Sequence, residues 1–71
     1  MLYIVIEIQS IGNSCTTLTW SFNNQDQAMA KFFSVLAAAA VSSVPIHSAV
    51  IITDRGDMVR SEHFYHAGEA E

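Results

Sequence analysis

Cysteine and basic residues are both scarce in this sequence. Cys15 is the single cysteine among the 71 residues, so no disulfide can form within the chain, and we expect a reducing compartment. Three basic residues, Lys31, Arg55 and Arg60, stand against seven acidic ones and give a net charge of −4. Binding to phosphate backbones or to anionic membrane surfaces draws on clustered Lys and Arg. The composition therefore argues against a nucleic-acid or membrane partner.

Long hydrophobic runs are absent as well. The longest apolar run covers residues 35–41, far short of the roughly 20 residues that cross a bilayer. Residues 1–6 contain no basic region and lead into an alternating segment instead of a small-residue cleavage site. We therefore expect a soluble, cytoplasmic chain without a signal peptide.

Apolar residues, in contrast, are plentiful. They make up 51% of the chain against 14% charged residues, and the mean hydropathy is +0.28. A chain of this length removes only about 60% of its unfolded surface from water on folding. No repeat, charge block or linker divides the sequence. We expect one domain over residues 1–66, followed by an acidic, frayed tail at residues 67–71.

Two alternating segments near the N-terminus predict a β-hairpin. In residues 2–9, one face of the expected strand is wholly aliphatic and the other is mixed. The aliphatic positions are Leu2, Ile4, Ile6 and Ile8, and the mixed positions are Tyr3, Val5, Glu7 and Gln9. Residues 11–14 supply turn chemistry, and residues 16–22 alternate again. In this second strand, Leu18, Trp20 and Phe22 lie opposite Thr17, Thr19 and Ser21.

A helix is predicted to follow. Asn24 and Gln27 have the spacing of a capping box, and Asp26 suits the positive end of the helix dipole. The stripe expected to face the sheet consists of Met29, Phe32, Phe33, Leu36 and Ala40. The opposite stripe consists of Gln27, Lys31, Ser34, Ala38 and Ser42. Pro45, together with the two serines before Val44, is expected to end the helix, whose outer side is smooth over residues 37–41.

The C-terminal half predicts a second hairpin. Residues 46–53 are apolar on both faces through their middle, which is typical of a central strand. Residues 54–57 form a turn in which Gly56 is free to take a positive φ, and residues 58–65 form the last strand. A helical crossover leaves room for the first strand between the second and the third. We therefore predict an α+β fold, ββαββ, with a four-stranded antiparallel sheet in the order 2-1-3-4 and one helix on one face.

The sheet face without the helix is predicted to be too apolar to stay in water. We expect it to carry half of the third and fourth strands together with Tyr3, Val5, Glu7, Thr17, Thr19 and Ser21. Self-association into a dimer or higher oligomer is expected through this face, through the outer side of the helix, or through both. The candidate interface or ligand residues are Tyr3, Glu7, Thr17, Thr19, Arg60, Ala38 and Val41.

Two segments carry a resemblance to other proteins. Residues 3–9 read YIVIEIQ, and residues 36–49 read LAAAAVSSVPIHSA. In these stretches the chain resembles a group of small uncharacterised proteins encoded by phages and prophages of Gram-positive gut bacteria. The resemblance covers most of the chain but includes no known catalytic motif. It implies a phage context, in which the chain would work in the cytoplasm of the host cell, and it assigns no functional residue.

The sequence suggests one group of residues that could bind a metal ion, and it consists mainly of histidines. His63 and His66 lie near Glu62, with His47 further away. Residues three apart on a strand point to opposite faces, so the two histidines share a metal only if the strand ends before His66. We interpret them as polar residues at a strand end and expect no metal or other cofactor. Zinc bound across a subunit interface is the alternative.

The remaining motifs have plain structural interpretations. Cys15 is interpreted as a small turn residue, because nothing in the sequence supplies the histidine and third group that an activated thiol needs. Residues 55–57, RGD, match an integrin-binding tripeptide but are explained by turn chemistry.

Arg60 is expected to pair with a carboxylate such as Glu7, and an anionic ligand is its alternative partner. The hydroxyl row of the second strand is interpreted as a solvent face, with a ligand in a cleft between subunits as the alternative.

These observations favour a non-enzymatic function. We expect a self-associating phage accessory protein that binds a host protein, or sequesters a small anionic signal molecule, for counter-defence or host takeover. The alternative is a virion structural or assembly accessory protein. An enzyme would have to pool side chains from several subunits, and no pair in the sequence has a spacing that indicates acid–base catalysis.

Overall fold

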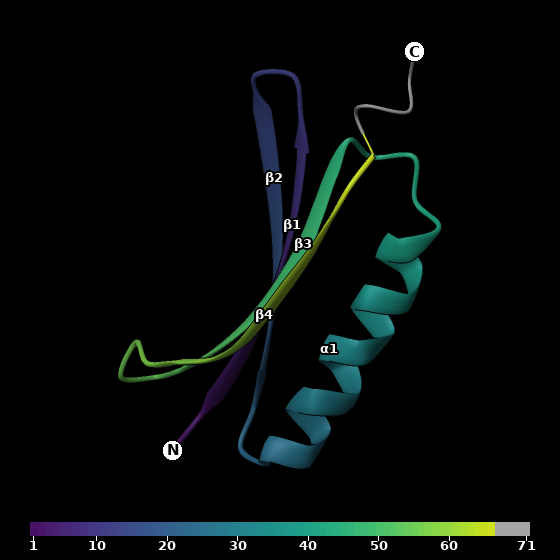
Figure 1. Cartoon of the computed structure of the whole chain (residues 1–71). Helices are drawn as coiled ribbons and strands as arrows, with labels where there is room; N and C mark the ends of the chain where they lie inside the picture. The colour runs from purple at the N-terminus through teal and green to yellow at the C-terminus, as the bar shows by residue number, and fades with distance from the viewer. Residues whose placement is uncertain (67–71) are drawn as a thin grey trace.

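The computed structural model describes residues 1–66 and contains one helix and four strands (Figure 1). In chain order these elements are β1 (Tyr3–Ile11), β2 (Ser14–Phe22), α1 (Gln25–Ala40), β3 (Ile46–Thr53) and β4 (Met58–Tyr65). The frayed tail predicted at residues 67–71 lies outside the described residues.

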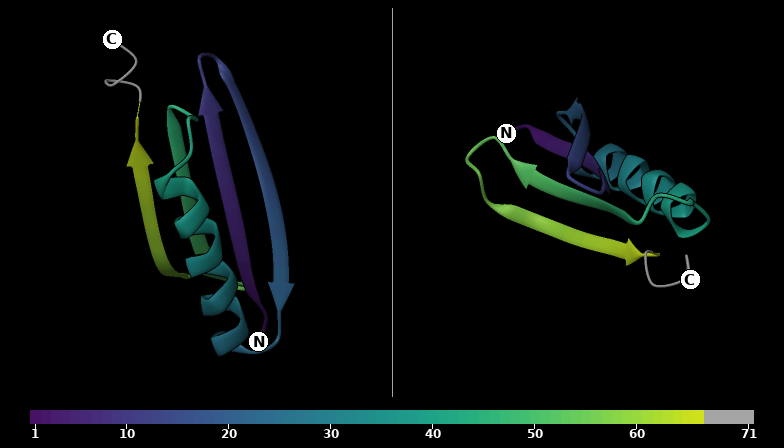
Figure 2. Two further views of the ribbon diagram at one scale, coloured as in Figure 1. Left: turned by 90° about the vertical axis from the view of Figure 1, so that its right-hand side faces the viewer. Right: turned by 90° about the horizontal axis from the view of Figure 1, so that it is seen from above.

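The sheet confirms the predicted fold class and topology. Its strand order is β2-β1-β3-β4, and every neighbouring pair is antiparallel. The two most apolar strands, β1 and β3, occupy the centre. The helix α1 lies on one face of the sheet, as both views in Figure 2 show. The predicted ββαββ arrangement is therefore correct.

The β1–β2 turn fixes which residues share a face. Only Gly12 and Asn13 lie between the strands, and Ile11 pairs with Ser14. Gly12 has φ +59°, which suits the first central position of a type II′ turn. An even number of turn residues makes odd-numbered positions of β1 face even-numbered positions of β2. Val5 therefore pairs with Trp20.

The helix begins where the sequence predicts. The Asn24 Oδ1 atom accepts hydrogen bonds from the backbone N–H groups of Asp26, at 2.8 Å, and Gln27, at 3.2 Å. The helix ends at Ala40, and Val41 caps it. Pro45 follows shortly and separates the helix from β3.

The buried stripe of α1 is rotated from the predicted one. Its buried positions are Ala28, Phe32, Val35 and Ala39. Phe32 was predicted correctly, but Phe33 is 48% exposed and Ala40 is exposed. The rotated stripe carries alanine at both ends, and these small side chains allow the helix backbone to approach the sheet closely.

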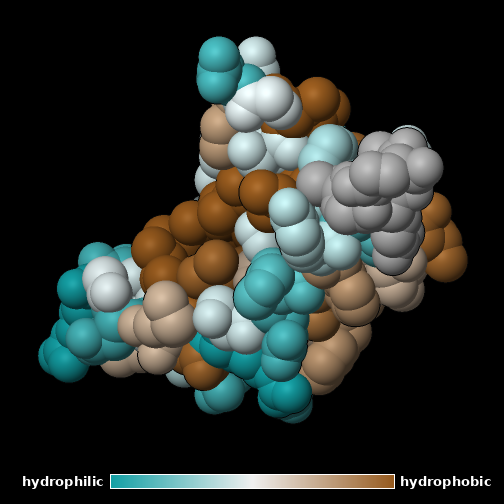
Figure 3. Space-filling model, turned by 45° about the horizontal axis from the view of Figure 1, so that its top comes forward, coloured by the Kyte–Doolittle hydropathy of each residue, from teal (hydrophilic) through white to brown (hydrophobic). Residues whose placement is uncertain are grey.

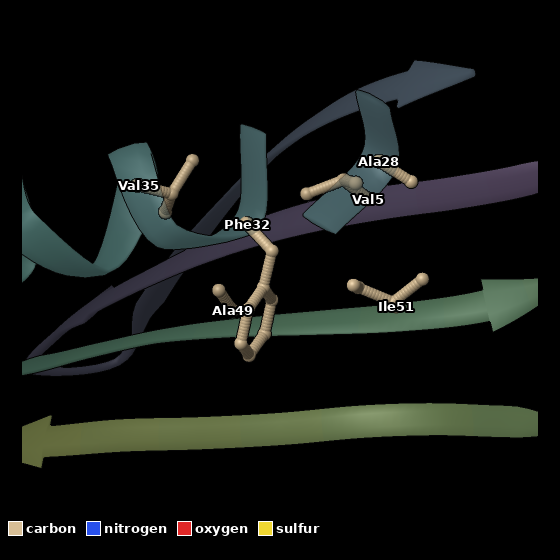
Figure 4. Packing of buried hydrophobic residues seen from close by; sticks show 6 residues of the cluster. All are labelled: Val5, Ala28, Phe32, Val35, Ala49 and Ile51. Atoms are coloured by element: carbon tan, nitrogen blue, oxygen red, sulfur yellow. The ribbon is translucent and has the colours of Figure 1, made fainter. Parts of the chain in front are cut away.

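The helix covers the expected face of β2 but the opposite face of β1 from the one expected. The core consists of Val5, Ala28, Phe32, Val35, Ala49 and Ile51. Figure 4 shows Phe32 projecting from α1 toward β3, which carries Ala49 and Ile51. The prediction that Tyr3, Val5 and Glu7 lie on the uncovered face is wrong. A change of one residue in the pairing moves a strand's side chains to the other face, and the two-residue turn sets the pairing here.

Candidate functional site

The uncovered side of the sheet is the candidate site, and we call it the open face. Strand register defines its members, which alternate with the residues beneath the helix. They are Ile4, Ile6, Ile8 and Ser10 of β1, Cys15, Thr17, Thr19 and Ser21 of β2, Ile46, Ser48, Val50 and Ile52 of β3, and Met58, Ser61, His63 and Tyr65 of β4. No element of residues 1–66 covers them, because the helix lies on the other side (Figure 2).

The open face is aliphatic at its centre and uncharged. Its central residues on β1 and β3 are half-buried against one another, while the hydroxyl residues of β2 and β4 are exposed at its sides. Among the described strands, the only Asp, Glu, Lys or Arg side chains belong to Glu7, Arg60 and Glu62, and their register places them on the covered face. Figure 3 shows hydrophobic atoms gathered between the two hydrophilic hairpin turns.

A shallow hollow lies on the open face over β3 and β4. Its volume is about 370 Å³, near the lower end of the range for small-molecule pockets. The hollow is lined by Ile46, Ser48, Val50, Met58, Ser61, Glu62 and His63. Most of the lining surface is apolar, although four of the seven residues are polar and supply two hydroxyls, one imidazole and, at the edge of the sheet, the Glu62 carboxylate. These groups suit an apolar side chain of a partner better than an anion.

A buried polar cluster lies on the covered face. The His47 Nε2 atom lies 2.5 Å from the Glu7 Oε2 atom, and the Gln9 side-chain amide donates to the same oxygen at 3.1 Å. The His47 and Glu7 side chains are only 5% and 12% exposed. The His47 Nδ1 atom is buried and has no hydrogen-bond partner in the described part of the chain. The cluster joins β1 to β3 within the fold and does not reach the open face.

The structure separates the candidate residues predicted from the sequence. Thr17 and Thr19 lie on the open face, whereas Tyr3 and Glu7 lie on the covered face. Ala38 is exposed on the outer side of α1, and Val41, at its C-terminal cap, is 87% exposed.

Arg60 does not make the predicted ion pair. Its guanidinium lies over the Phe33 ring, 5.4 Å from the ring centre, while Glu7 contacts His47 and Gln9 instead. Lys31 makes a similar contact with Trp20, at 4.2 Å. The helix is thus joined to each edge strand by a cation on an aromatic ring.

The histidines near the C-terminus lie in different environments. His63 is on the open face, whereas the His66 ring stacks on Phe64 and its Nε2 atom lies 3.1 Å from the Ala39 carbonyl oxygen. No group of three or more His, Cys, Asp or Glu residues within residues 1–66 is arranged to hold a metal ion. Cys15 is exposed and lies in β2, not in the turn as predicted.

The sequence did not predict that the aliphatic residues of β1 lie on the open face. Ile4, Ile6 and Ile8 were grouped correctly with one another but placed beneath the helix. The available signal was Gly12 followed by Asn13, a pair suited to a two-residue turn. That turn length would have placed the isoleucines beside Thr17, Thr19 and Ser21. The contact between Glu7 and His47 had no local signal, because the two residues are 40 positions apart.

Comparison of the chain with known protein families, with characterised proteins and with solved structures finds no match. Within residues 1–66 there is also no helix with the length and apolar character needed to cross a bilayer.

Proposed function

We propose that the chain is a non-enzymatic, self-associating binding protein whose copies stack through their open faces. The observation that carries this proposal is an aliphatic, uncharged sheet face that nothing in residues 1–66 covers. Contiguous apolar surfaces of this kind mark protein interaction sites, because burying them removes hydrocarbon from water.

The size of the open face suits a dimer. Four strands about 4.8 Å apart, each contributing about eight residues of roughly 3.3 Å rise, give a face of about 500 Å² per copy. Stacking two copies then buries about 1,000 Å², which is about the minimum for a specific interface. Two sheets packed about 10 Å apart would form a sandwich with the helices outside.

Charge favours a second copy as the occupant. The chain has a net charge of −4, so two copies repel each other over most of their surfaces. The open face carries none of the Asp, Glu, Lys or Arg residues of the described strands. Two copies can therefore meet there without burying like charges. A smaller contact with the hollow over β3 and β4 would leave most of the face in water.

The assembled protein is proposed to bind a host protein during phage infection. The phage setting is supported by the resemblance of residues 3–9 and 36–49 to phage proteins. A protein partner is favoured over a small anionic molecule, because the open face has no Lys or Arg and Arg60 is engaged with Phe33. A counter-defence role predicts that deleting the gene lowers phage yield only in hosts that carry the relevant defence. Fixed-copy incorporation of the chain into purified virions would overturn this role in favour of a structural one.

The self-association test places one charge on either side of the molecule. Ile6→Lys puts an ammonium at the centre of the open face, while Ala38→Lys puts the same group on the outer side of α1. We expect Ile6→Lys to lower the solution mass, measured by sedimentation equilibrium, and Ala38→Lys to leave it unchanged. If only Ala38→Lys lowers the mass, the interface is the helix and the proposal is wrong.

A further inference from the structure

The two edge strands of the sheet differ in their protection against further pairing. Strand β4 carries Arg60 and Glu62, and its pairing with β3 shifts register between Ile51 and Ile52, where β4 has an extra residue, Val59. Charges and bulges of this kind keep exposed edges from pairing with other chains. Strand β2 has neither feature. Its nine residues pair with β1 in unbroken register and include no charged residue and no proline.

The outer side of β2 is open to another strand. Residues 14–19 are all exposed, and Leu18, at the middle of the strand, is 49% exposed. A two-residue turn closes on a hydrogen-bonded pair, which is Ile11 with Ser14 here. Antiparallel pairs alternate between hydrogen-bonded and non-hydrogen-bonded types. Even-numbered residues of β2 therefore direct their backbone groups toward β1. The outward-directed backbone groups belong to Cys15, Thr17, Thr19 and Ser21.

We propose that β2 pairs antiparallel with β2 of a second copy, with Leu18 opposite Leu18 of that copy. In this register Thr17 faces Thr19 and Cys15 faces Ser21, so the outward groups of both strands match in reciprocal pairs. These pairs supply about eight backbone hydrogen bonds across a two-fold axis. Because β2 has no charged side chain, two copies of a chain with net charge −4 can approach there.

Edge pairing uses a different surface from open-face stacking and does not depend on it. The paired sheets would form one eight-stranded sheet with both helices on the same side. If both contacts form, the assembly is a tetramer with dihedral symmetry. If only the edge contact forms, the assembly is a dimer whose open faces remain exposed.

Cysteine cross-linking tests the pairing and its register. In a Cys15→Ser background, Leu18→Cys places two thiols on a non-hydrogen-bonded pair with Cα atoms about 4.5 Å apart, within the range of a disulfide. Thr16→Cys is the matched control, since it lies on the same face of β2 but its copies would be about 13 Å apart. We expect Leu18→Cys to give a covalent dimer under mild oxidation, at least tenfold more than Thr16→Cys. Equal cross-linking of the two variants, or none by Leu18→Cys, overturns the proposal. The latter result would also be found if an extended peptide of another protein occupied the edge.

Hydrogen exchange of the unmodified chain provides a second measurement. We expect the amides of Cys15, Thr17, Thr19 and Ser21 to exchange at least tenfold more slowly as the protein concentration is raised. Exchange at these four amides that is independent of concentration contradicts edge pairing.

Repeating the cross-linking with Ile6→Lys added separates the two contacts. Persistent cross-linking with a lowered mass supports both proposals, whereas cross-linking with an unchanged mass retains edge pairing and refutes stacking.

Discussion

The two faces of the sheet are built from alternate residues of the same four strands but have different chemistry. The covered face carries aromatic residues, the hydrogen-bonded pair Glu7 and His47, and the Arg60 cation, which lies over the Phe33 ring of α1. The open face carries isoleucine, valine and hydroxyl side chains. The described strands place no Asp, Glu, Lys or Arg residue there.

This difference shows how a short chain can be both folded and incompletely buried. On the covered face, Glu7 and Arg60 have partners within the chain, so that face is suited to packing beneath α1. On the open face, the aliphatic side chains pack only against their neighbours in the sheet. The high mean hydropathy of +0.28 is therefore shared between a core and a surface. The surface is suited to contact with another molecule.

Lysine substitutions at two adjacent positions of β1 are expected to give the largest difference between the two faces. Val5 is fully buried beneath the helix, whereas Ile6 is half-exposed on the open face. We expect Val5→Lys to unfold the domain, because an unpaired charge in the core costs several kcal/mol of a total stability of about 5–15 kcal/mol. Ile6→Lys should cost about 1 kcal/mol. Circular dichroism and urea unfolding measure both. A folded Val5→Lys variant would contradict the assignment of the faces.

A second comparison uses two neighbouring phenylalanines of α1. Phe32 is fully buried, while Phe33 is 48% exposed. We expect Phe32→Ala to lower the free energy of unfolding by about 3–5 kcal/mol, through lost burial and the cavity left behind. Phe33→Ala should lower it by about 1 kcal/mol. Urea titration of both variants gives the difference, and equal losses would mean that the helix is rotated from its described position.

The buried polar cluster is expected to have a smaller effect. Glu7→Ala leaves the His47 Nε2 atom without its acceptor and should cost about 1–3 kcal/mol in urea unfolding. Glu7→Gln retains a carbonyl oxygen that can accept from His47, so it should cost less than Glu7→Ala. A loss from Glu7→Gln as large as that from Glu7→Ala would show that the hydrogen bond is not the stabilising feature.

The smallest expected effect concerns the contact at the side of the helix. Lys31 lies over the ring of Trp20, the single tryptophan of the chain. We expect Lys31→Gln to lower the free energy of unfolding by about 0.5–1 kcal/mol and to change the tryptophan fluorescence. Lys31→Arg retains a cation and should restore most of the stability. Identical stabilities for all three proteins would contradict a stabilising role for this contact.

The arrangement of the strands could be predicted from the sequence because its signals are local. Alternation in residues 2–9 and 16–22, the Asn24 cap, and the turn at Gly56 each act within a few residues. The central position of β1 and β3 followed from their apolar composition. These signals were sufficient for the fold class and the strand order.

The choice of covered face could not be made from hydrophobicity alone. Ile4, Ile6 and Ile8 form the more aliphatic side of β1, yet α1 packs on the side that carries Val5 and Glu7. The chain can bury Glu7 because His47, on β3, contacts it across the sheet. Such a long-range contact gives no periodic pattern. The rotation of Phe33 toward solvent likewise depends on how closely the alanines of α1 approach the sheet.

Another copy of the chain, we propose, covers the open face. The most direct test is the mass of the unmodified protein in solution, measured by sedimentation equilibrium over a wide range of concentration. We expect a mass of at least twice 7.8 kDa that falls as the protein is diluted and that is lowered by Ile6→Lys, which leaves edge pairing intact. A constant mass of 7.8 kDa up to the highest concentration would contradict the claim.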